Sequence, residues 1–330
     1  MLDINLSEVE FAPQAVHLAS LLVCQVQAEL ASAAMTKDDH SPVTVADFAA
    51  QALVGGLLAE RFPDDILVAE EEARPLCGSE GQEMLQQVTG YVKRFAPQAT
   101  PEAVCAWIER GTGQPGRRFW TLDPLDGTKG FLRGGQFAVA LALLMDGLVE
   151  VGVLGCPNLC DSSLPGSGRS GSLVVAVRGQ GCWATSLAEP GRYQPLNVSK
   201  RSDPAQMRLL RSFEAGHTNQ EAIDRLAQLF GAQIPSLRMD SQAKYALLAA
   251  GASDLMVRLL SPQNPDYREK IWDQAAGSLV LEEAGGRVTD LHGKPLDFTS
   301  GRTLTHNRGV LASNGLFHPL ALDLLASLGV

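Results

Sequence analysis

The feature that most constrains the fold is a series of strand-like segments in the middle of the chain. Five segments are rich in apolar and β-branched residues, and Gly, Pro, Ser or Asp separates each from the next. They cover residues 118–122, 136–144, 148–156, 173–177 and 181–184. Because strands joined by short turns pair with their neighbours in sequence, the first three predict an antiparallel meander. A loop rich in Ser and Gly is expected at 161–172.

Helical patterns precede these strands. Apolar residues recur at helical spacing over 8–34 and again over 46–61, where the sequence Phe62-Pro63-Asp64-Asp65 ends the second pattern. Residues 66–69 are typical of a short buried strand. No hydrophobic period is sustained over 74–117, apart from a candidate helix at 81–95, and this segment is typical of an insertion or a mobile flap.

The second half of the chain alternates strand-like and helical segments. The strands are predicted at 207–212 and 255–260, and the helices at 219–230, 243–250 and 272–283. This alternation favours a sheet covered by helices. We therefore expect two domains, an α+β domain at 1–160 and an α/β domain at 161–330.

Charge and composition narrow the classes of function. The 330-residue chain has a net charge of -10, which opposes binding to nucleic-acid polymers or anionic membranes, because broad basic surfaces hold these. The first eight residues lack the basic and apolar regions of a signal peptide, and no apolar run approaches the roughly 20 residues of a membrane span. We expect a cytoplasmic protein with a small ligand. Its six cysteines are expected to be reduced, and a redox role for Cys156 and Cys160 is left open.

The segment FWTLDPLDGTKGF, residues 119–131, carries the strongest chemical signal. A strand runs into a turn that places Asp123 and Asp126 three positions apart, where both carboxylates can be aimed at one point. Hard cations such as Mg²⁺ prefer such oxygens, and Gly127 lets the backbone approach a ligand closely. The alternative is an ordinary polar turn after a strand.

Three further acids are candidates to join this pair. Glu70 begins an acidic run at a strand end, Asp273 begins a helix rich in small residues, and Asp47 enters a helix. Each has an ordinary explanation, which is a solvated acidic surface for Glu70 and helix capping for the two aspartates. Taken together, the acids predict a site for several Mg²⁺ ions, which would clamp a phosphate and lower the pKa of a bound water.

The motifs resemble those of the inositol monophosphatase superfamily. Asp123-Pro-Leu-Asp-Gly-Thr128 is similar to its first signature, and Trp272-Asp273 followed by Glu283-Ala-Gly-Gly286 is similar to its second. Segments 41–47, 118–133, 240–245 and 267–273 resemble the bisphosphate nucleotidase branch in particular. The resemblance implies a layered α-β-α-β-α sandwich. It also implies hydrolysis of the 3'-phosphate of adenosine 3',5'-bisphosphate, and of its 5'-phosphosulfate analogue, with Mg²⁺ as cofactor.

The resemblance assigns roles to single residues. The implied magnesium ligands are Glu70, Asp123, Asp126, Asp273 and the main-chain carbonyl of Leu125. Asp47 and Thr128 would orient and deprotonate the attacking water. The residues implied to bind the nucleotide are Thr128, His217, Ser241, Lys244, Arg258 and Asp273. Lithium sensitivity is implied in the same way and by no residue directly.

The two cations of this set have ordinary alternatives. Lys244 and Arg258 would supply the charge that a second, non-reacting phosphate needs in an acidic protein. Without the resemblance, Lys244 is typical of a helix surface, Arg258 of a structural ion pair and His217 of a loop.

A few departures from the family pattern bear on specificity. Gln274 stands where the branch commonly has His, Ala215 replaces a position that is often basic, and 261–266 is longer than the equivalent loop. Inositol phosphates or a sugar bisphosphate are therefore the alternative substrates. A non-catalytic binding protein is the alternative class, which the intact acids and Thr128 disfavour.

Overall fold

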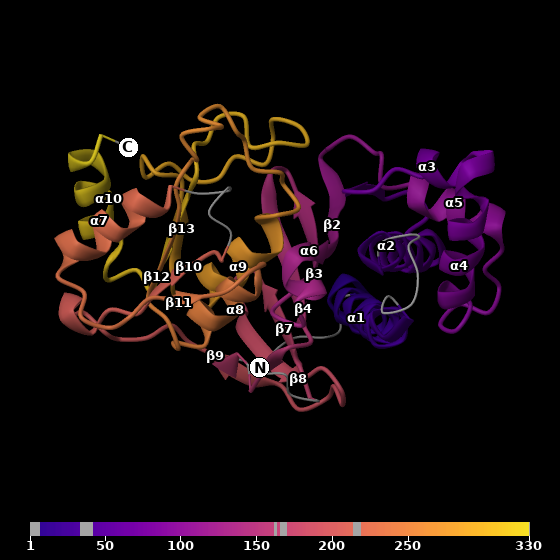
Figure 1. Ribbon diagram of the computed structural model, residues 1–330, viewed down its shortest axis with the longest axis horizontal. Helices are drawn as coiled ribbons and strands as arrows, with labels where there is room; N and C mark the ends of the chain where they lie inside the picture. The colour runs from indigo at the N-terminus through magenta and orange to yellow at the C-terminus, as the bar shows by residue number, and fades with distance from the viewer. Residues whose placement is uncertain (1–6, 34–41, 162–163, 166–169, 214–218, 330) are drawn as a thin grey trace.

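The chain folds into five layers in the order α-β-α-β-α (Figure 1). The computed structural model describes residues 7–33, 42–161, 164–165, 170–213 and 219–329. Two sheets stand side by side with helices between them and on both outer faces. The layered sandwich predicted from the sequence is confirmed.

The larger sheet has seven strands in the order β1-β2-β3-β4-β7-β8-β9. They are β1 (Ile66–Ala69), β2 (Arg118–Asp126), β3 (Ala138–Met145), β4 (Leu148–Cys156), β7 (Ser172–Val177), β8 (Gly181–Ser186) and β9 (Gln194–Leu196). Neighbours from β2 to β9 are antiparallel, so the predicted meander is confirmed, whereas β1 joins β2 in parallel. Within the expected loop, β6 (Leu164–Pro165) pairs with β5 (Leu159–Cys160).

Helices α1 (Ser7–Ala33) and α2 (Pro42–Arg61) cover the outer face of this sheet. Val16 and Leu22 of α1 are fully buried in one core with Leu141 and Val153 of the sheet. Among the described residues, Ser7–Glu29 is the one helical stretch long and apolar enough to cross a membrane by length and composition. This corrects the expectation that no apolar run approaches that length. Its packing against the sheet is the environment of a core helix.

Helices α8 (Ala243–Ala249) and α9 (Ala275–Glu283) form the middle layer. Side chains of β3 alternate between the two cores, with Leu141 toward α1 and Ala140 toward α8 and α9, as the two-residue period of a strand requires. Helix α9 approaches β4 closely, since a Cβ atom on Gly152 would lie 2.8 Å from the carbonyl oxygen of Ala276. The middle layer therefore holds the two sheets in a fixed relation.

The smaller sheet has five strands in the order β11-β10-β12-β14-β13. They are β10 (Leu209–Arg211), β11 (Leu237–Arg238), β12 (Leu255–Arg258), β13 (Arg287–Thr289) and β14 (Val310–Ser313). Strand β10 is parallel to β11 and β12, and β14 is antiparallel to β12 and β13. Helices α7 (Gln220–Phe230) and α10 (His318–Ser327) cover the outer face, where the rings of Phe230 and Phe317 meet edge to face at 6.2 Å.

The segment 74–117 has more helical structure than the single candidate helix predicted there, and its assignment as an insertion or a mobile flap stays a prediction. The segment forms α3 (Arg74–Cys77), η1 (Ser79–Gly81), α4 (Gln82–Val92) and α5 (Pro101–Glu109). Helix α4 matches the candidate helix at 81–95, and both α4 and α5 pack on α2 through fully buried residues such as Val88 and Ile108. Helix α5 has a capping Thr100 and a Pro at its first turn, which are start signals that its short apolar stripe obscured.

The larger sheet continues beyond the predicted boundary at residue 160. Strands β7, β8 and β9 extend it to Leu196, after which η2 (Pro204–Gln206) leads into the smaller sheet. Helix α9 packs against strands of both sheets. The division into two domains stays a prediction.

Candidate active site

Two parallel strands bring the first two acids together. Strand β1 pairs with β2 so that Ala69 lies opposite Leu122. The next residues are Glu70 and Asp123, so both leave the same carboxyl-terminal end of the strand pair. Asp123 is only 2% exposed, whereas Glu70 reaches solvent. The pairing thus explains why an acid after one strand and an acid in the next become neighbours.

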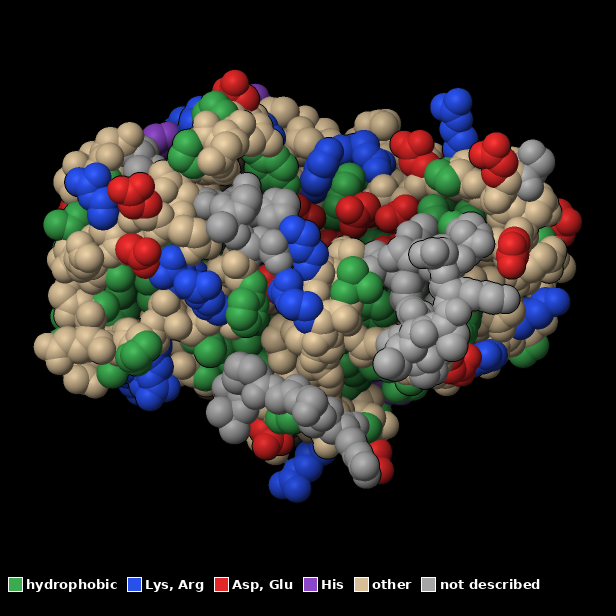
Figure 2. Space-filling view, viewed as in Figure 1, with side chains coloured by type: hydrophobic (Ala, Val, Ile, Leu, Met, Phe, Trp, Pro, Cys, Tyr) green, Lys and Arg blue, Asp and Glu red, His purple; other side chains and the backbone are tan. Residues whose placement is uncertain are grey.

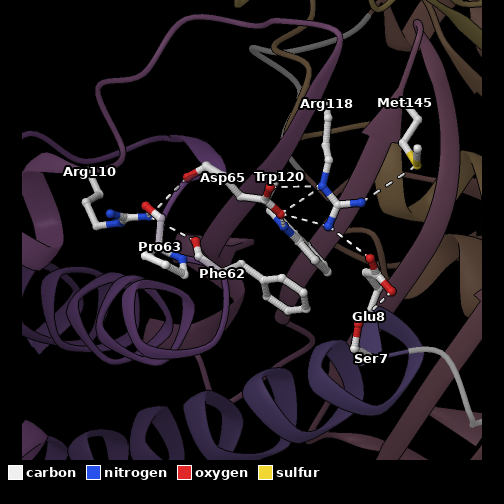
Figure 3. Close-up of polar contacts among 9 residues, drawn as sticks. All are labelled: Ser7, Glu8, Phe62, Pro63, Asp65, Arg110, Arg118, Trp120 and Met145. Carbon is white, nitrogen blue, oxygen red and sulfur yellow. Dashed lines mark hydrogen bonds and ion pairs between the residues drawn. The ribbon is translucent and has the colours of Figure 1, made fainter.

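A polar network fixes the opposite end of this strand pair (Figure 3). Arg118, the first residue of β2, lies 2.9 Å from Asp65 and 3.0 Å from Glu8 of α1. The indole of Trp120 donates to the Asp65 carboxylate at 2.8 Å, and Arg110 donates to the Asp65 carbonyl at 3.0 Å. These contacts tie the residue before β1 to the start of β2. By fixing how β1 aligns with β2, these contacts also fix the relative positions of Glu70 and Asp123 at the other end of the strand pair.

A β-bulge places Asp123 and Asp126 on the same side of the strand. Asp123 lies opposite Ala140 of β3 and Asp126 opposite Ala138, so three steps along β2 match two along β3. Without the extra residue, a spacing of three would put the two side chains on opposite faces. Within the bulge, the backbone N–H of Leu125 donates to Asp123 Oδ1 at 3.1 Å.

The turn after Asp126 meets the second half of the chain at close range. Gly127 has a φ of +87°, and a Cβ atom there would lie 2.8 Å from the Cβ of Ser241. Ser241 has a φ of +66°, which is uncommon for a residue other than glycine. The backbone N–H of Gln242 then donates to Asp126 Oδ2 at 2.5 Å, although the two residues are 116 positions apart. Helix α6 (Thr128–Leu132) starts directly after this turn.

The side chain of Gln242 carries this connection on to Asp273. Its amide donates to the carbonyl of Trp272 at 2.9 Å and accepts from the N–H of Gly277 at 3.0 Å. Trp272 directly precedes Asp273, so one buried glutamine joins two acid-bearing segments. Helix α9 starts two residues beyond Asp273, with Gln274 at its cap position. The capping alternative for Asp273 was therefore wrong.

Asp47 lies inside α2 and is 6% exposed, so the capping alternative was wrong for this residue too. One turn later, the side chain of Gln51 accepts from the N–H of Glu71 at 2.9 Å and donates to its carbonyl at 2.7 Å. These two hydrogen bonds hold the segment that follows β1 against helix α2. It also packs on α6, whose first residue is Thr128.

Five acids form what we call the acidic cluster. They are Asp47, Glu70, Asp123, Asp126 and Asp273. Burial raises the pKa of every member and is the largest cause in each case. Repulsion within the cluster adds to it, as Glu70 and Asp126 both raise the pKa of Asp123. Although Glu70 reaches solvent, the dense protein around it and the charges of Glu71 and Asp126 raise its pKa to about 7. The cluster is therefore a concentration of negative charge that a cation would relieve.

The donor set of the acidic cluster fits a hard divalent cation. Carboxylate oxygens are the ligands that Mg²⁺ and Ca²⁺ prefer, and the raised pKa values report charge that lacks sufficient compensation. In the part of the chain that the structure describes, no three Asp, Glu, His or Cys side chains form a group arranged to hold a metal ion. Neutralisation by a cation would remove the repulsion that opposes such convergence.

A cavity of about 430 Å³ adjoins the acidic cluster. Asp126 and Asp273 line it, together with the cations Lys244 of α8 and Arg258 of β12, which we call the basic pair. A cavity of this size suits a small-molecule ligand. Figure 2 shows acidic side chains beside Lys and Arg side chains near the middle of the molecule. Opposite charges thus meet at one hollow.

The two members of the basic pair differ in exposure, since Lys244 is buried and Arg258 is half-buried. Lys244 is 9% exposed, and its ammonium donates to the carbonyl of Met239 at 3.4 Å. Burial lowers the pKa of Lys244 to about 8. The alternative of a surface lysine was therefore wrong. Arg258 lies 2.7 Å from Glu269, so it forms the ion pair of the alternative interpretation and also lines the cavity.

Arg302 is a residue of the site that the sequence analysis missed. Its guanidinium donates to the carbonyls of Ala69, Gly111 and Gly113, the last two at 3.0 and 3.1 Å. It also lies 4.9 Å from the ring centre of Trp272. Ala69 precedes Glu70 and Trp272 precedes Asp273, so one side chain clamps two segments of the acidic cluster. Its contact with Ala69 spans 233 positions, and no local pattern signals it.

The structure brings most of the predicted site residues together. Six line the cavity, and they are Asp126, Thr128, Ser241, Lys244, Arg258 and Asp273. Asp47, Glu70 and Asp123 join them through the electrostatic cluster, and Leu125 lies in the bulge. His217 and the departure at Ala215 lie outside the described residues. The individual roles of these residues stay predictions.

Comparisons with known proteins agree with this geometry. A model of the inositol monophosphatase family matches residues 5–328. The chain is 43% identical to a 3'(2'),5'-bisphosphate nucleotidase of Emericella nidulans, with 92% of each chain covered. It is 42% identical to a protein of the same name from Schizosaccharomyces pombe, over 94% of this chain and 93% of the relative.

Solved structures give the same fold. An inositol monophosphatase from Anabaena superposes with a TM-score of 0.63 at 23% identity, covering 96% of this chain and 94% of the other. An IMPase from Thermotoga maritima gives 0.64 at 20% identity, with 98% of each chain covered. At these identities the likeness concerns the fold alone. The family model and the curated relatives together show that the chain belongs to the inositol monophosphatase family.

Proposed function

We propose that this protein is a phosphomonoesterase that hydrolyses the 3'-phosphate of adenosine 3',5'-bisphosphate to give AMP and phosphate. The 5'-phosphosulfate analogue is proposed as a second substrate. The observation that carries this proposal is the cavity with acidic residues, the buried Lys244 and the half-buried Arg258 in its lining. A monophosphate of a neutral alcohol needs only the acidic residues and the metal ions that they would hold. A bisphosphate would use both the acidic residues and the basic pair. The names of the curated relatives support the same substrate class.

We propose Mg²⁺ as the cofactor, held by Glu70, Asp123, Asp126, Asp273 and the carbonyl of Leu125. When bound, the metal would supply Lewis-acid chemistry, polarising the phosphoryl group and making water more acidic. Asp47 and Thr128 are proposed to orient the attacking water and take its proton. A buried carboxylate whose pKa is raised, as that of Asp47 is, accepts a proton more readily than an exposed one.

The basic pair is proposed to bind the phosphate that does not react. Lys244 and Arg258 come from different elements and line the same cavity, so their charges can act on one anion. Ser241 lines the cavity beside them in its left-handed conformation. Such strain is retained where the surrounding structure requires it, and it is common at ligand sites.

A substrate panel at fixed Mg²⁺ tests the proposal. Phosphate release is measured with adenosine 3',5'-bisphosphate, inositol monophosphate and fructose bisphosphate. The bisphosphorylated nucleotide is expected to have the highest kcat/KM. The alternative function is an inositol phosphate or sugar bisphosphate phosphatase, and a higher kcat/KM for either of those substrates would replace the proposed function with it. A cytoplasmic location stays a separate prediction.

A further inference from the structure

Arg258 stands at the end of a buried chain of polar side chains. Its Nε lies 2.7 Å from Oε1 of Glu269. The other oxygen of Glu269 accepts from the amide of Gln274 at 2.9 Å, and Gln274 accepts from the hydroxyl of Tyr245 at 2.6 Å. Glu269 and Gln274 are each 3% exposed and Tyr245 is 2% exposed. Four residues of the C-terminal half therefore meet in one chain, and three of them, Arg258, Gln274 and Tyr245, also line the cavity.

The contact between Arg258 and Glu269 is an ion pair, and Oε1 of Glu269 makes no hydrogen bond within the described residues. The chemistry of the groups fixes the direction of the two hydrogen bonds beyond it. A guanidinium only donates and an ionised carboxylate only accepts, so Gln274 must turn its NH₂ group toward Glu269. Its carbonyl then faces Tyr245, whose hydroxyl must donate. No group can reverse its role without leaving a buried partner unsatisfied, which is costly in a desolvated site. The chain therefore holds Glu269 in one orientation.

The backbone and a neighbouring ring restrain the same place. The carbonyl of Glu269 accepts from the N–H of Leu304 at 2.9 Å, and Lys270 forms a β-bridge with Thr303. The Arg258 guanidinium lies 5.7 Å from the ring centre of Tyr267. A guanidinium engaged through Nε still has two terminal amino groups, whose fork matches phosphate oxygens.

We propose that Glu269, supported by Gln274 and Tyr245, is a positioning residue that holds Arg258 for a second phosphate and so sets the preference for bisphosphorylated substrates. This inference rests on the proposed function. A preorganised guanidinium loses less conformational freedom when the anion binds. Lys244 contacts Met239 and Ser212 instead, so the chain acts on one of the two cations only.

The test uses Glu269→Gln and two substrates that differ by one phosphate. For adenosine 3',5'-bisphosphate, KM is expected to rise roughly tenfold, the worth of one charge-assisted contact, with kcat nearly unchanged. For adenosine 3'-monophosphate, KM is expected to change less than about twofold, because Arg258 has no second phosphate to bind. A role in folding alone would change both substrates equally, and that result would overturn the proposal.

Tyr245→Phe removes only the far hydroxyl and is expected to change the same ratio of KM values in the same direction by a smaller factor. If Glu269→Gln does not fold, this variant decides the question. In the double variant the two effects are expected to be less than multiplicative. Once Glu269 is replaced, the Tyr245 hydroxyl can no longer act on Arg258 through it. Independent, multiplicative effects would contradict action through one chain.

The matched control is Asp254→Asn. Asp254 is a fully buried carboxylate paired with Arg201 at 3.0 Å and does not line the cavity. This variant is expected to lower the melting temperature and to leave the ratio of KM values unchanged. A shift of the ratio as large as that of Glu269→Gln would overturn the specific role.

Calorimetric binding of 5'-AMP separates this inference from the proposed function. Glu269→Gln is expected to weaken AMP binding roughly tenfold, while binding of adenosine, which has no phosphate, stays the same. If the wild-type enzyme shows no preference for the bisphosphate, the proposed function fails. If the wild type shows it and both variants keep the wild-type ratio and AMP affinity, the positioning role fails alone.

Discussion

The acidic cluster and the basic pair adjoin one cavity, yet they are built in opposite ways. The acids come from β2, α2, the residue after β1 and the turn before α9, and burial raises the pKa of each, with repulsion adding to it for all but Asp126. The two cations come from α8 and β12, and Arg258 has a buried carboxylate beside it. The first arrangement lacks sufficient positive charge, and the second has its positive charge held in place.

This difference indicates two separate tasks. A metal cation would stabilise carboxylates that are buried together, so the acidic cluster is suited to metal ions and to the reacting phosphate beside them. Restrained cations bind an anion without first being ordered, so the basic pair is suited to a phosphate that only has to be held. Substitutions on the two sides should therefore change different kinetic constants.

The largest effect is expected from Asp126→Asn. Asp126 belongs to the acidic cluster and lines the cavity, so kcat should fall on the order of a thousandfold or more. In metal-free buffer the variant should be at least as stable as the wild type to heat, because a repelling charge is removed while the amide oxygen still accepts from Gln242. Asp146→Asn, in an exposed ion pair with Arg117, is the control with normal activity. Full activity of Asp126→Asn would refute the metal role of the cluster.

A smaller loss is expected from Arg302→Ala, which breaks the clamp between the segments of Glu70 and Asp273. Removing contacts to three carbonyls should cost about 1–3 kcal/mol of unfolding free energy and reduce kcat roughly 10- to 100-fold. Arg302→Lys should recover only part of the lost stability and kcat, since an ammonium lacks the planar fork of a guanidinium. Thermal unfolding and steady-state kinetics check this prediction. Unchanged kcat in both variants would show that the clamp does not position the acids.

Lys244→Ala tests the role of the basic pair in binding the second phosphate. We expect KM for adenosine 3',5'-bisphosphate to rise about tenfold and KM for adenosine 3'-monophosphate to change little, because only the former carries the second phosphate. The control is Lys200→Ala at an exposed position away from the cavity. Equal increases for both substrates would count against the assignment.

The smallest effect is expected from pH. Burial lowers the pKa of Lys244 from 10.5 to about 8, so its charge in the free enzyme is present below pH 8 and lost above it. The kcat/KM for the bisphosphate should therefore fall a fewfold between pH 7 and 9. Because the unfolded chain keeps this proton up to about pH 10.5, the same group makes folding more favourable as pH rises from about 8 to about 10.5. Lys244→Arg should flatten the profile, and an unchanged profile would indicate another titrating group.

Local patterns predicted much of the fold and the acids. Short apolar segments separated by turn residues predicted the meander, and the run from Asp123 to Gly127 marked the turn that carries two acids. Helices α3 and α5 were missed because their apolar stripes are short and lie beside Gly and Pro, whereas α4 was predicted. The exact start of α9 was also misjudged, which made Asp273 resemble a cap.

Long-range contacts could not be predicted from local sequence patterns. Gln242, Glu269 and Arg302 act through partners in other elements, and nothing in their own neighbourhoods indicates it.

The environment of the cysteines could not be predicted from the sequence either. Cys156 is buried and burial raises the pKa of its thiol, which argues against a reactive thiolate, while the sulfurs of Cys77 and Cys105 lie 3.1 Å apart although 28 positions separate them.

Titration of Mg²⁺ by calorimetry into the wild type, Asp123→Asn and Lys244→Ala tests the separation of tasks most directly. The wild type is expected to bind Mg²⁺, and Asp123→Asn to bind it at least tenfold more weakly because a buried ligand of the acidic cluster is neutralised. Lys244→Ala should bind it as tightly as the wild type or more tightly, since a nearby positive charge is gone. Equal affinity in wild type and Asp123→Asn, or a loss in Lys244→Ala alone, would contradict the account.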